Sequence, residues 1–250
     1  MGTQGDLKAT VLHQIHNGPL GGHSGYFKSL HRLQQDFYWP GMKKDLKKHI
    51  RECYTYQRVK TETCKPAGLL RPLPIPVRPW LDISINFVEG LPKSQQKDVI
   101  LVVVYRFSKY VQFIPLAHPY TASRVAALYM EFVFKLHGMP SSIVSDIDPI
   151  FTSHFWTAFM KLQGVKLAIS SASHPQTDGQ TKVGNKSLEQ YLMVFAADKP
   201  HSWVEWLPLA EYWFNTNFHT STNLTPFEVL YGYPPLRLLD YMPGTTKVVS

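Results

Sequence analysis

A proline-rich segment divides this chain into two parts with different periodicity, and it constrains the fold more than any other feature of the sequence. Residues 66–80 carry five prolines, a density that excludes a helix and favours extended backbone. Residues 8–60 before it have the spacing of short amphipathic helices, whereas the segments after it alternate or are continuously apolar, as strands are. The sequence therefore predicts a helical unit at 8–65, a linker at 66–80, a larger core at 81–236 and a tail at 237–250.

The core has the order three strands, helix, strand, helix, strand, then helices. Strands are expected at 83–88, 99–105, 111–116, 142–145 and 165–169, and helices at 121–137, 153–163, 178–196 and 201–217, with a polar loop at 170–177. The first three strands can pair as an antiparallel meander, and the later ones, which alternate with helices, should extend the sheet in parallel. The predicted class is α/β with a mixed five-stranded sheet. The helix at 201–217 is apolar nearly all round, so it should be buried against the core or a second copy.

The charge of the chain is positive and uneven. The formal net charge is +8 over 250 residues, and residues 1–65 carry 11 Lys and Arg against 5 Asp and Glu. A basic N-terminal quarter is typical of a small nucleic-acid-binding module. Two cysteines imply no disulfide framework, the polar N-terminus does not resemble a signal peptide, and the longest apolar run is too short for a membrane span. These features favour an intracellular protein with a nucleic-acid partner and no membrane.

Five separated blocks carry a family resemblance. They are Trp39-Pro40-Gly41-Met42, Asp98–Val104, Ile143-Val144-Ser145-Asp146, His174–Thr181 and Leu224–Gly232. In this order they resemble the integrase of a plant-like, gypsy-class LTR retrotransposon. The resemblance implies an RNase H-like core, preceded by a small helical His/Cys zinc-binding-type domain. It also implies DNA integration with Mg²⁺ or Mn²⁺, multimers on DNA ends, and a location in the nucleus or a cytoplasmic particle. The C-terminal region that usually follows in this family is not expected here.

The resemblance places the three catalytic acids of the family at Asn86, Asp146 and Lys182. The 35 residues between Asp146 and Lys182 match the family's spacing, so the register is intact although two side chains differ. Tyr105 stands where relatives carry another Asp. Two-metal phosphodiester chemistry needs carboxylates from several elements to converge on hard cations. Taken alone, Asp146 would be interpreted as a strand-end carboxylate or a helix cap.

Only Asp146 is left to supply a negative charge at these three positions. Asn86 can offer a weak neutral oxygen, and protonated Lys182 repels a cation by several kcal/mol at short range. Asp82 on the same strand face and Glu189 on the following helix are both expected to lie too far away to substitute. The sequence therefore predicts impaired catalysis.

The zinc-binding-type domain departs from its family in one ligand. His16, His23 and Cys53 match three of the four ligands, and Tyr56 replaces the second cysteine. Structural zinc takes four ligands in a tetrahedron, so zinc binding is doubtful, with Cys64 a badly spaced replacement. The alternative interpretation is a set of surface histidines and a small buried cysteine.

Two regions are candidates for DNA contact. The first is a basic stripe on the helix around residue 46, whose solvated face is the alternative reading. It comprises Lys43, Lys44, Lys47, Lys48 and Arg51, with Arg58 beyond it. The second is the polar, flexible segment His174–Thr181, where His174, Gln176 and Gln180 could donate to phosphates or bases.

The hypothesis that joins these observations is a degenerate integrase copy that binds nucleic acid. The changes at 86, 182 and 56 are each reachable by one G-to-A mutation, as expected after cytosine deamination. A non-enzymatic DNA-binding or assembly module derived from an integrase is the main alternative. An active nuclease with an atypical metal arrangement is the third.

Overall fold

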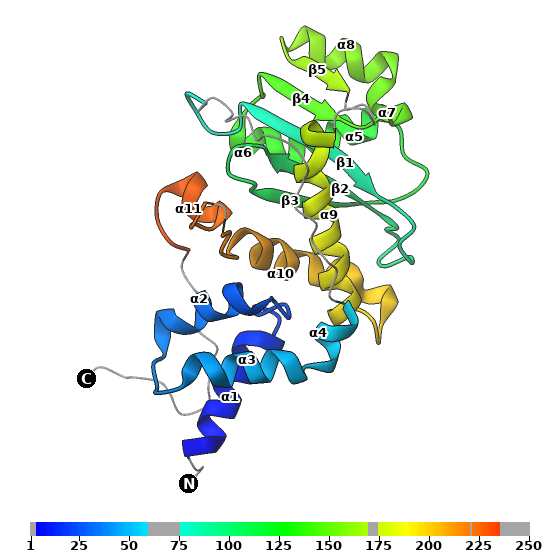
Figure 1. The fold of residues 1–250 in the computed structure, drawn as a ribbon. Helices are drawn as coiled ribbons and strands as arrows, with labels where there is room; N and C mark the ends of the chain where they lie inside the picture. The colour runs from blue at the N-terminus through cyan, green and yellow to red at the C-terminus, as the bar shows by residue number, and fades with distance from the viewer. Residues whose placement is uncertain (1–3, 60–75, 170–174, 221, 236–250) are drawn as a thin grey trace, which may run out of the picture.

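The computed structural model describes residues 4–59, 76–169, 175–220 and 222–235, so Cys64, His174 and the tail at 237–250 lie outside the described residues, as does most of the linker. The described part consists of a small helical domain and a larger three-layer domain, with one long helix reaching from the sheet to the small domain (Figure 1). Among these residues, no helix combines the length and the hydrophobicity needed to cross a bilayer.

The small domain is built from four helices, as the periodicity predicts. They are α1 (Gln4–Asn17), α2 (Tyr26–Asp36), α3 (Met42–Glu52) and α4 (Tyr54–Val59). The chain turns between α2 and α3 at Gly41, whose φ of 83° suits glycine. Leu33, Leu46 and Ile50 form the centre of a core that belongs to this domain alone.

The larger domain contains the predicted mixed sheet of five strands. The strands are β1 (Asp82–Val88), β2 (Val99–Tyr105), β3 (Val111–Leu116), β4 (Ser142–Ser145) and β5 (Lys166–Ile169), in the order β3-β2-β1-β4-β5. The first three strands pair antiparallel, and β4 and β5 extend the sheet in parallel from β1. The predicted topology is therefore confirmed.

Helices cover both faces of this sheet. One face packs against α5 (Ala122–Tyr129), the π-helical turn η1 (Met130–Phe134), α7 (Pro149–Thr152) and α8 (His154–Leu162), with α6 (Lys135–His137) continuing η1. The other face packs against α9 (Pro175–Phe195) and α10 (Trp203–Asn215), which follows the short η2 (Pro200–Ser202). Because both faces are covered, Ser84 and Asn86 are buried although they are polar. The apolar helix predicted at 201–217 is thus buried against the core, as one of the two expected solutions.

Two sequence-based expectations about elements were wrong. The segment predicted as a polar loop up to Thr177 is helical from Pro175, so Gln176 and Gln180 lie in the first turns of α9 and not in a flexible loop. The segment after Leu224 forms α11 (Pro226–Tyr231), which the sequence did not predict. Its start is fixed by a capping box between Thr225 and Glu228.

Candidate functional site

The positions of the first two catalytic acids lie side by side on neighbouring parallel strands. Ile85 on β1 pairs with Ser145 on β4, so the next pair in register is Asn86 and Asp146. Side chains alternate along a strand, and Val88 packs on the α9 face while Ile85 packs on the other. Asn86 therefore faces α9, and the backbone places position 146 beside it.

Asn86 brings a buried neutral amide to this place. Its side chain is 6% exposed, and its Oδ1 has no hydrogen-bond partner among the described residues. Leaving a buried carbonyl oxygen unpaired costs about 1–3 kcal/mol.

The third position, Lys182, lies on α9, which packs over β1, β2 and β4. The helix therefore passes over the two strands that carry Asn86 and Asp146, and Figure 1 shows it crossing the sheet at this place. The side chain of Lys182 is outside the described part of the structure.

Two residues near the family's acidic positions, Asp82 and Tyr105, are engaged elsewhere in the fold. Asp82 begins β1, at the end of the strand away from Asn86. It pairs with Ser142 of β4 and accepts a hydrogen bond from the Ser142 hydroxyl. Tyr105, where relatives carry an acid, packs into the core on the far face of the sheet and stacks on Trp80 with ring centroids 5.7 Å apart. Neither side chain takes part in the site at Asn86.

Sequence reasoning missed a group of residues beside Asp146. The Tyr120 hydroxyl donates to Glu89 Oε1 at 2.7 Å. The pKa of Tyr120 is raised by burial first, then by this hydrogen bond and by the negative charges of Glu89, Asp148 and Asp146. Asp148 is committed to capping α7, because its carboxylate accepts from the Ile150 amide at 2.7 Å. In the sequence, the one sign of this group of residues was the position of Glu89 directly after the strand β1.

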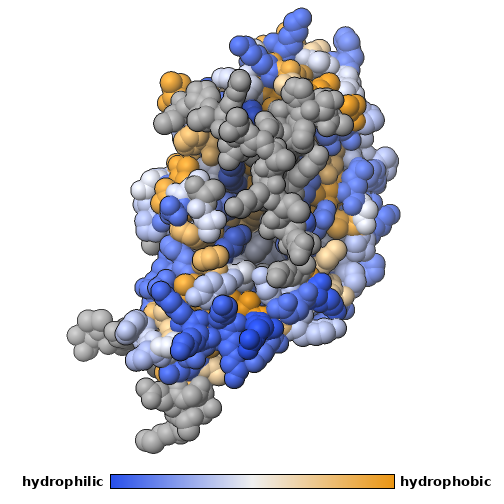
Figure 2. Space-filling view, in the orientation of Figure 1, coloured by the Kyte–Doolittle hydropathy of each residue, from blue (hydrophilic) through white to orange (hydrophobic). Residues whose placement is uncertain are grey.

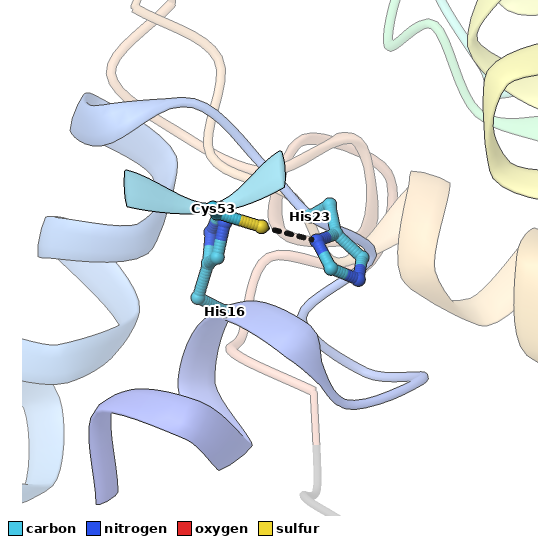
Figure 3. Close-up of side chains that lie close together, drawn as sticks. All are labelled: His16, His23 and Cys53. Atoms are coloured by element: carbon cyan, nitrogen blue, oxygen red, sulfur yellow. Dashed lines mark hydrogen bonds between the residues drawn. The ribbon is translucent and has the colours of Figure 1, made fainter. Parts of the chain in front are cut away.

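The three residues predicted as zinc ligands converge. His16 ends α1, His23 lies in the following loop and Cys53 follows α3, and one ligand atom from each lies within 4.8 Å of the others. The His23 Nδ1 and Cys53 Sγ atoms are 3.2 Å apart. Figure 3 shows the side chains pointing toward one another from three separate segments.

His16 is the buried member of this group. It is 0% exposed, and neither ring nitrogen has a hydrogen-bond partner among the described residues. Its pKa falls to about 3, because of burial first and then because of the nearby His23 and His49. A neutral imidazole is the form in which a histidine binds zinc, so these three residues fit the metal.

The fourth position is occupied by a side chain that does not suit zinc. Tyr56 lies in α4, with its ring centroid 5.8 Å from that of His16, and its backbone N–H donates to Cys53 Sγ at 3.5 Å. Burial raises the pKa of the Tyr56 phenol, which keeps it protonated. A protonated phenol is a poor substitute for a thiolate in a structural zinc site.

The sequence of this chain is similar to sequences of known proteins. Residues 3–62 match the family described as the integrase zinc binding domain. The transposon Tf2-3 and Tf2-4 polyproteins of Schizosaccharomyces pombe are each 32% identical to the chain over 229 residues, which is 92% of this chain and 17% of the polyprotein. The chain is homologous to retrotransposon integrases. It spans about a sixth of the length of these curated relatives.

Solved integrases share the fold at low identity. The catalytic core domain of HTLV-2 integrase in complex with magnesium aligns with a TM-score of 0.50 and 17% identity, covering 62% of this chain and 99% of that one. A chain of the simian T-cell lymphotropic virus intasome in complex with the PP2A regulatory subunit B56 gamma aligns with a TM-score of 0.55 and 16% identity, covering 92% of this chain and 79% of that one. The larger domain therefore has the RNase H-like fold of solved integrase cores, and it follows a region that matches the integrase zinc-binding family.

The zinc-binding domain of this integrase homologue presents its basic stripe to solvent. Lys43, Lys44, Lys47, Lys48 and Arg51 are all exposed on α3. Met42, Leu46 and Ile50 on the opposite side of the helix are buried. Figure 2 shows hydrophilic residues gathered over the N-terminal helices at the lower end of the molecule. The side chains of Gln176 and Gln180 are not among those described.

A second feature that sequence reasoning missed is the contact between the two domains of the integrase homologue. The Trp213 indole N–H on α10 donates to the Gly21 carbonyl at 3.0 Å and to Ser24 Oγ at 3.2 Å. The Tyr191 hydroxyl on α9 donates to the Pro19 carbonyl at 3.0 Å. The loop that carries His23 is therefore held by α9 and α10, the two helices that cover the Asn86 face of the sheet.

Proposed function

We propose that this chain is a degenerate integrase of the gypsy class, of plant-like descent, that binds DNA but no longer carries out metal-dependent polynucleotidyl transfer. The observation that carries this proposal is the register of β1 and β4, which sets Asn86 beside Asp146 under α9. This register supports the interpretation that the amide at 86 stands in place of an acid and does not reflect a shifted strand.

The residues at this place do not fit a pair of Mg²⁺ ions. Such ions prefer several anionic oxygens, and here Asn86 is neutral and Lys182 on α9 brings a positive charge. The nearby Asp148 is engaged in its cap, and Glu89 bonds to Tyr120. Asp146 alone cannot balance the +4 of two divalent ions, so we derive no catalytic step from this site.

Zinc is the metal that the chain still fits in part. His16, His23 and Cys53 would hold it, and it would supply a structural crosslink between the end of α1, the loop after it and the end of α3. With three protein ligands the affinity is expected to be lower than for a four-ligand site, and the small domain gains correspondingly less folding free energy.

DNA is the proposed partner, and the α3 stripe is the proposed contact. Phosphate contacts by lysine and arginine release counterions, so affinity should fall steeply with salt. Multimers on DNA ends and a nuclear location are proposed with it, on the family resemblance. Other basic surfaces on the chain do not affect the test of this contact, because the test changes residues of α3 alone.

The test is duplex DNA binding as a function of salt. Replacing Lys47 and Lys48 together by Ala should reduce the slope of log K against log[salt] by about 2, because two phosphate contacts are lost. Lys161→Ala is the matched control, since Lys161 is exposed on α8 of the other domain. Affinity that does not change between low and high salt would rule out phosphate-driven binding.

The degenerate status has its own test in the nucleotide sequence. An excess of G-to-A differences from an intact copy, including those at codons 56, 86 and 182, would support decay by cytosine deamination. Mostly synonymous differences without that excess would instead support a copy retained for binding or assembly.

A further inference from the structure

A pocket between the two domains has features of a ligand site. It has a volume of about 410 Å³ and is lined by α2 of the zinc-binding domain, by α10 and α11 of the core, and by the segment after α10. Figure 1 shows α2 lying below α10 and α11 on the same side of the molecule. Pockets of this size, built at a domain boundary and largely apolar, are where small ligands commonly bind.

Lys28 is the cation that this pocket leaves without an anion. Its ammonium makes no hydrogen bond or ion pair with any described residue, and it lies 5.9 Å from the centroid of the Trp213 ring. The pKa of Lys28 is lowered to about 8, because of burial first and then because of the neighbouring Arg32. The side chain is partly buried, and a charge removed in part from water is favoured when a counter-charge is supplied.

A second cation, Arg32, and a neutral histidine, His219, lie near Lys28. Arg32, one turn further along α2, also lines the pocket and donates to Asn217 Oδ1 at 3.1 Å. His219 is held neutral: its pKa falls to about 4, because of burial first and then because of the charges of Lys28 and Lys109. His219 Nε2 is also buried without a hydrogen-bond partner among the described residues.

Two carboxylates line the same pocket but do not neutralise Lys28. Glu228 is engaged in the capping box of α11, where it accepts from the Thr225 amide at 2.8 Å. Asp36 lies eight residues after Lys28 on α2, a rise of about 12 Å along the helix. An incoming anion would therefore supply a counter-charge that these two carboxylates do not.

Part of the remaining wall is aromatic. The rings of His31 and Phe218 stack with centroids 4.1 Å apart and planes inclined by 19°, and Tyr212 and Phe37 also line the pocket. Such surfaces take planar rings, and nucleobases stack on aromatic side chains regardless of sequence.

We propose that this interdomain pocket binds a nucleotide, with its phosphate at Lys28 and Arg32 and its base against the Phe218 wall. The ligand could be a free nucleotide or the terminal nucleotide of a DNA strand, which share this chemistry. This goes beyond duplex binding by α3, because the pocket lies between domains and uses none of the exposed lysines of that helix.

The experiment measures binding of deoxyadenosine monophosphate to the full chain by calorimetry. Lys28→Met should weaken binding by about tenfold or more, because it removes the charge and keeps the aliphatic stem. Phe218→Leu should weaken it through the lost stacking surface, and Lys161→Met, on exposed α8, should leave it unchanged. Lys28→Met should also raise the unfolding midpoint of the ligand-free chain, which verifies that it folds.

The arms of the experiment separate the ligand chemistries. Deoxyadenosine should bind at least about tenfold more weakly than its monophosphate. A single-stranded oligonucleotide that competes only when it carries a 5′-phosphate identifies a strand end as the source, and lack of competition identifies free nucleotide. Equal affinity for the nucleoside and the nucleotide, or an unchanged affinity in Lys28→Met, would overturn the proposal. Duplex binding by the α3 variants is independent of either result.

Discussion

The contact between Gly22 and Trp213 gives the sharpest prediction about how the two domains are joined. Gly22 has φ of +59°, and a Cβ built there would lie 2.1 Å from Trp213 Nε1 and 2.4 Å from Cε2. Two non-bonded atoms cannot lie this close together. The Cβ added by Gly22→Ala must therefore displace the Trp213 indole or the loop that carries Gly22. The indole hydrogen bonds to Gly21 and Ser24 would be lost with it.

The expected cost has three parts. A residue with a side chain at this φ costs about 1–2 kcal/mol, and two lost hydrogen bonds cost about 1 kcal/mol each. Overpacking against a buried ring adds about 1 kcal/mol or more. Gly22→Ala should therefore lower the free energy of unfolding by about 4 kcal/mol or more, a large part of the about 5–15 kcal/mol typical of a domain.

Equilibrium urea unfolding, followed by near-ultraviolet circular dichroism, measures this change. Gly41→Ala is the matched control, because Gly41 has φ of +83° and nothing within 4 Å of its Cβ position, so it carries only the backbone cost. In a Trp213→Phe background, the loss caused by Gly22→Ala should shrink toward the Gly41→Ala value. If Gly22→Ala and Gly41→Ala destabilise the chain equally, the docking of the loop between α1 and α2 on α10 is wrong.

Three further predictions concern single side chains. Burial raises the pKa of the Glu211 carboxyl to about 7, so the folded state holds the carboxyl proton more tightly than the unfolded state. The free energy of unfolding should therefore fall as pH rises from about 4.5 through 7, by at most about 3 kcal/mol. Glu211→Gln should flatten this pH dependence of the unfolding free energy and raise stability at pH 8, and a profile unchanged by the substitution would contradict the assignment. Tyr56→Cys should tighten zinc binding by about tenfold or more in chelator competition, whereas Tyr54→Cys, on an exposed neighbour, should not; equal gains would show that the geometry at 56 is irrelevant. Asn215 accepts from the Val111 amide at 2.8 Å and donates to the Val111 carbonyl at 2.9 Å, so Asn215→Leu should cost about 2–3 kcal/mol in urea unfolding, and a cost below about 0.5 kcal/mol would refute this link between α10 and β3.

The sheet and its register could be predicted from the sequence because local pattern and tertiary role agree there. The run Val99–Tyr105 is apolar throughout and forms the fully buried strand β2, between β3 and β1. Thr121 caps α5 through its side chain, and Gly138 ends the helical stretch that follows, as expected from capping chemistry. The convergence of His16, His23 and Cys53 was expected only from the resemblance, since ligand spacing alone does not bring three segments together.

The remaining features depend on contacts between distant residues. The first turns of α9 are polar and resemble a loop, so their helical state was not visible in the periodicity of the sequence. Glu211 lies in an apolar helix and gives no sign that it will accept a hydrogen bond from β3. The docking of Trp213 on the loop after α1 joins residues 192 positions apart, and no local pattern encodes such a pairing.

The most direct measurement of the central claim is strand transfer on a DNA substrate with Mg²⁺ or Mn²⁺. The unaltered chain is expected to show no metal-dependent product. The double substitution Asn86→Asp with Lys182→Glu should restore turnover, since the strand register already holds position 86 beside Asp146, and adding Asp146→Ala should abolish it again. Turnover by the unaltered chain that Asp146→Ala removes would contradict the account, because it would show that a metal is held productively by the residues now present.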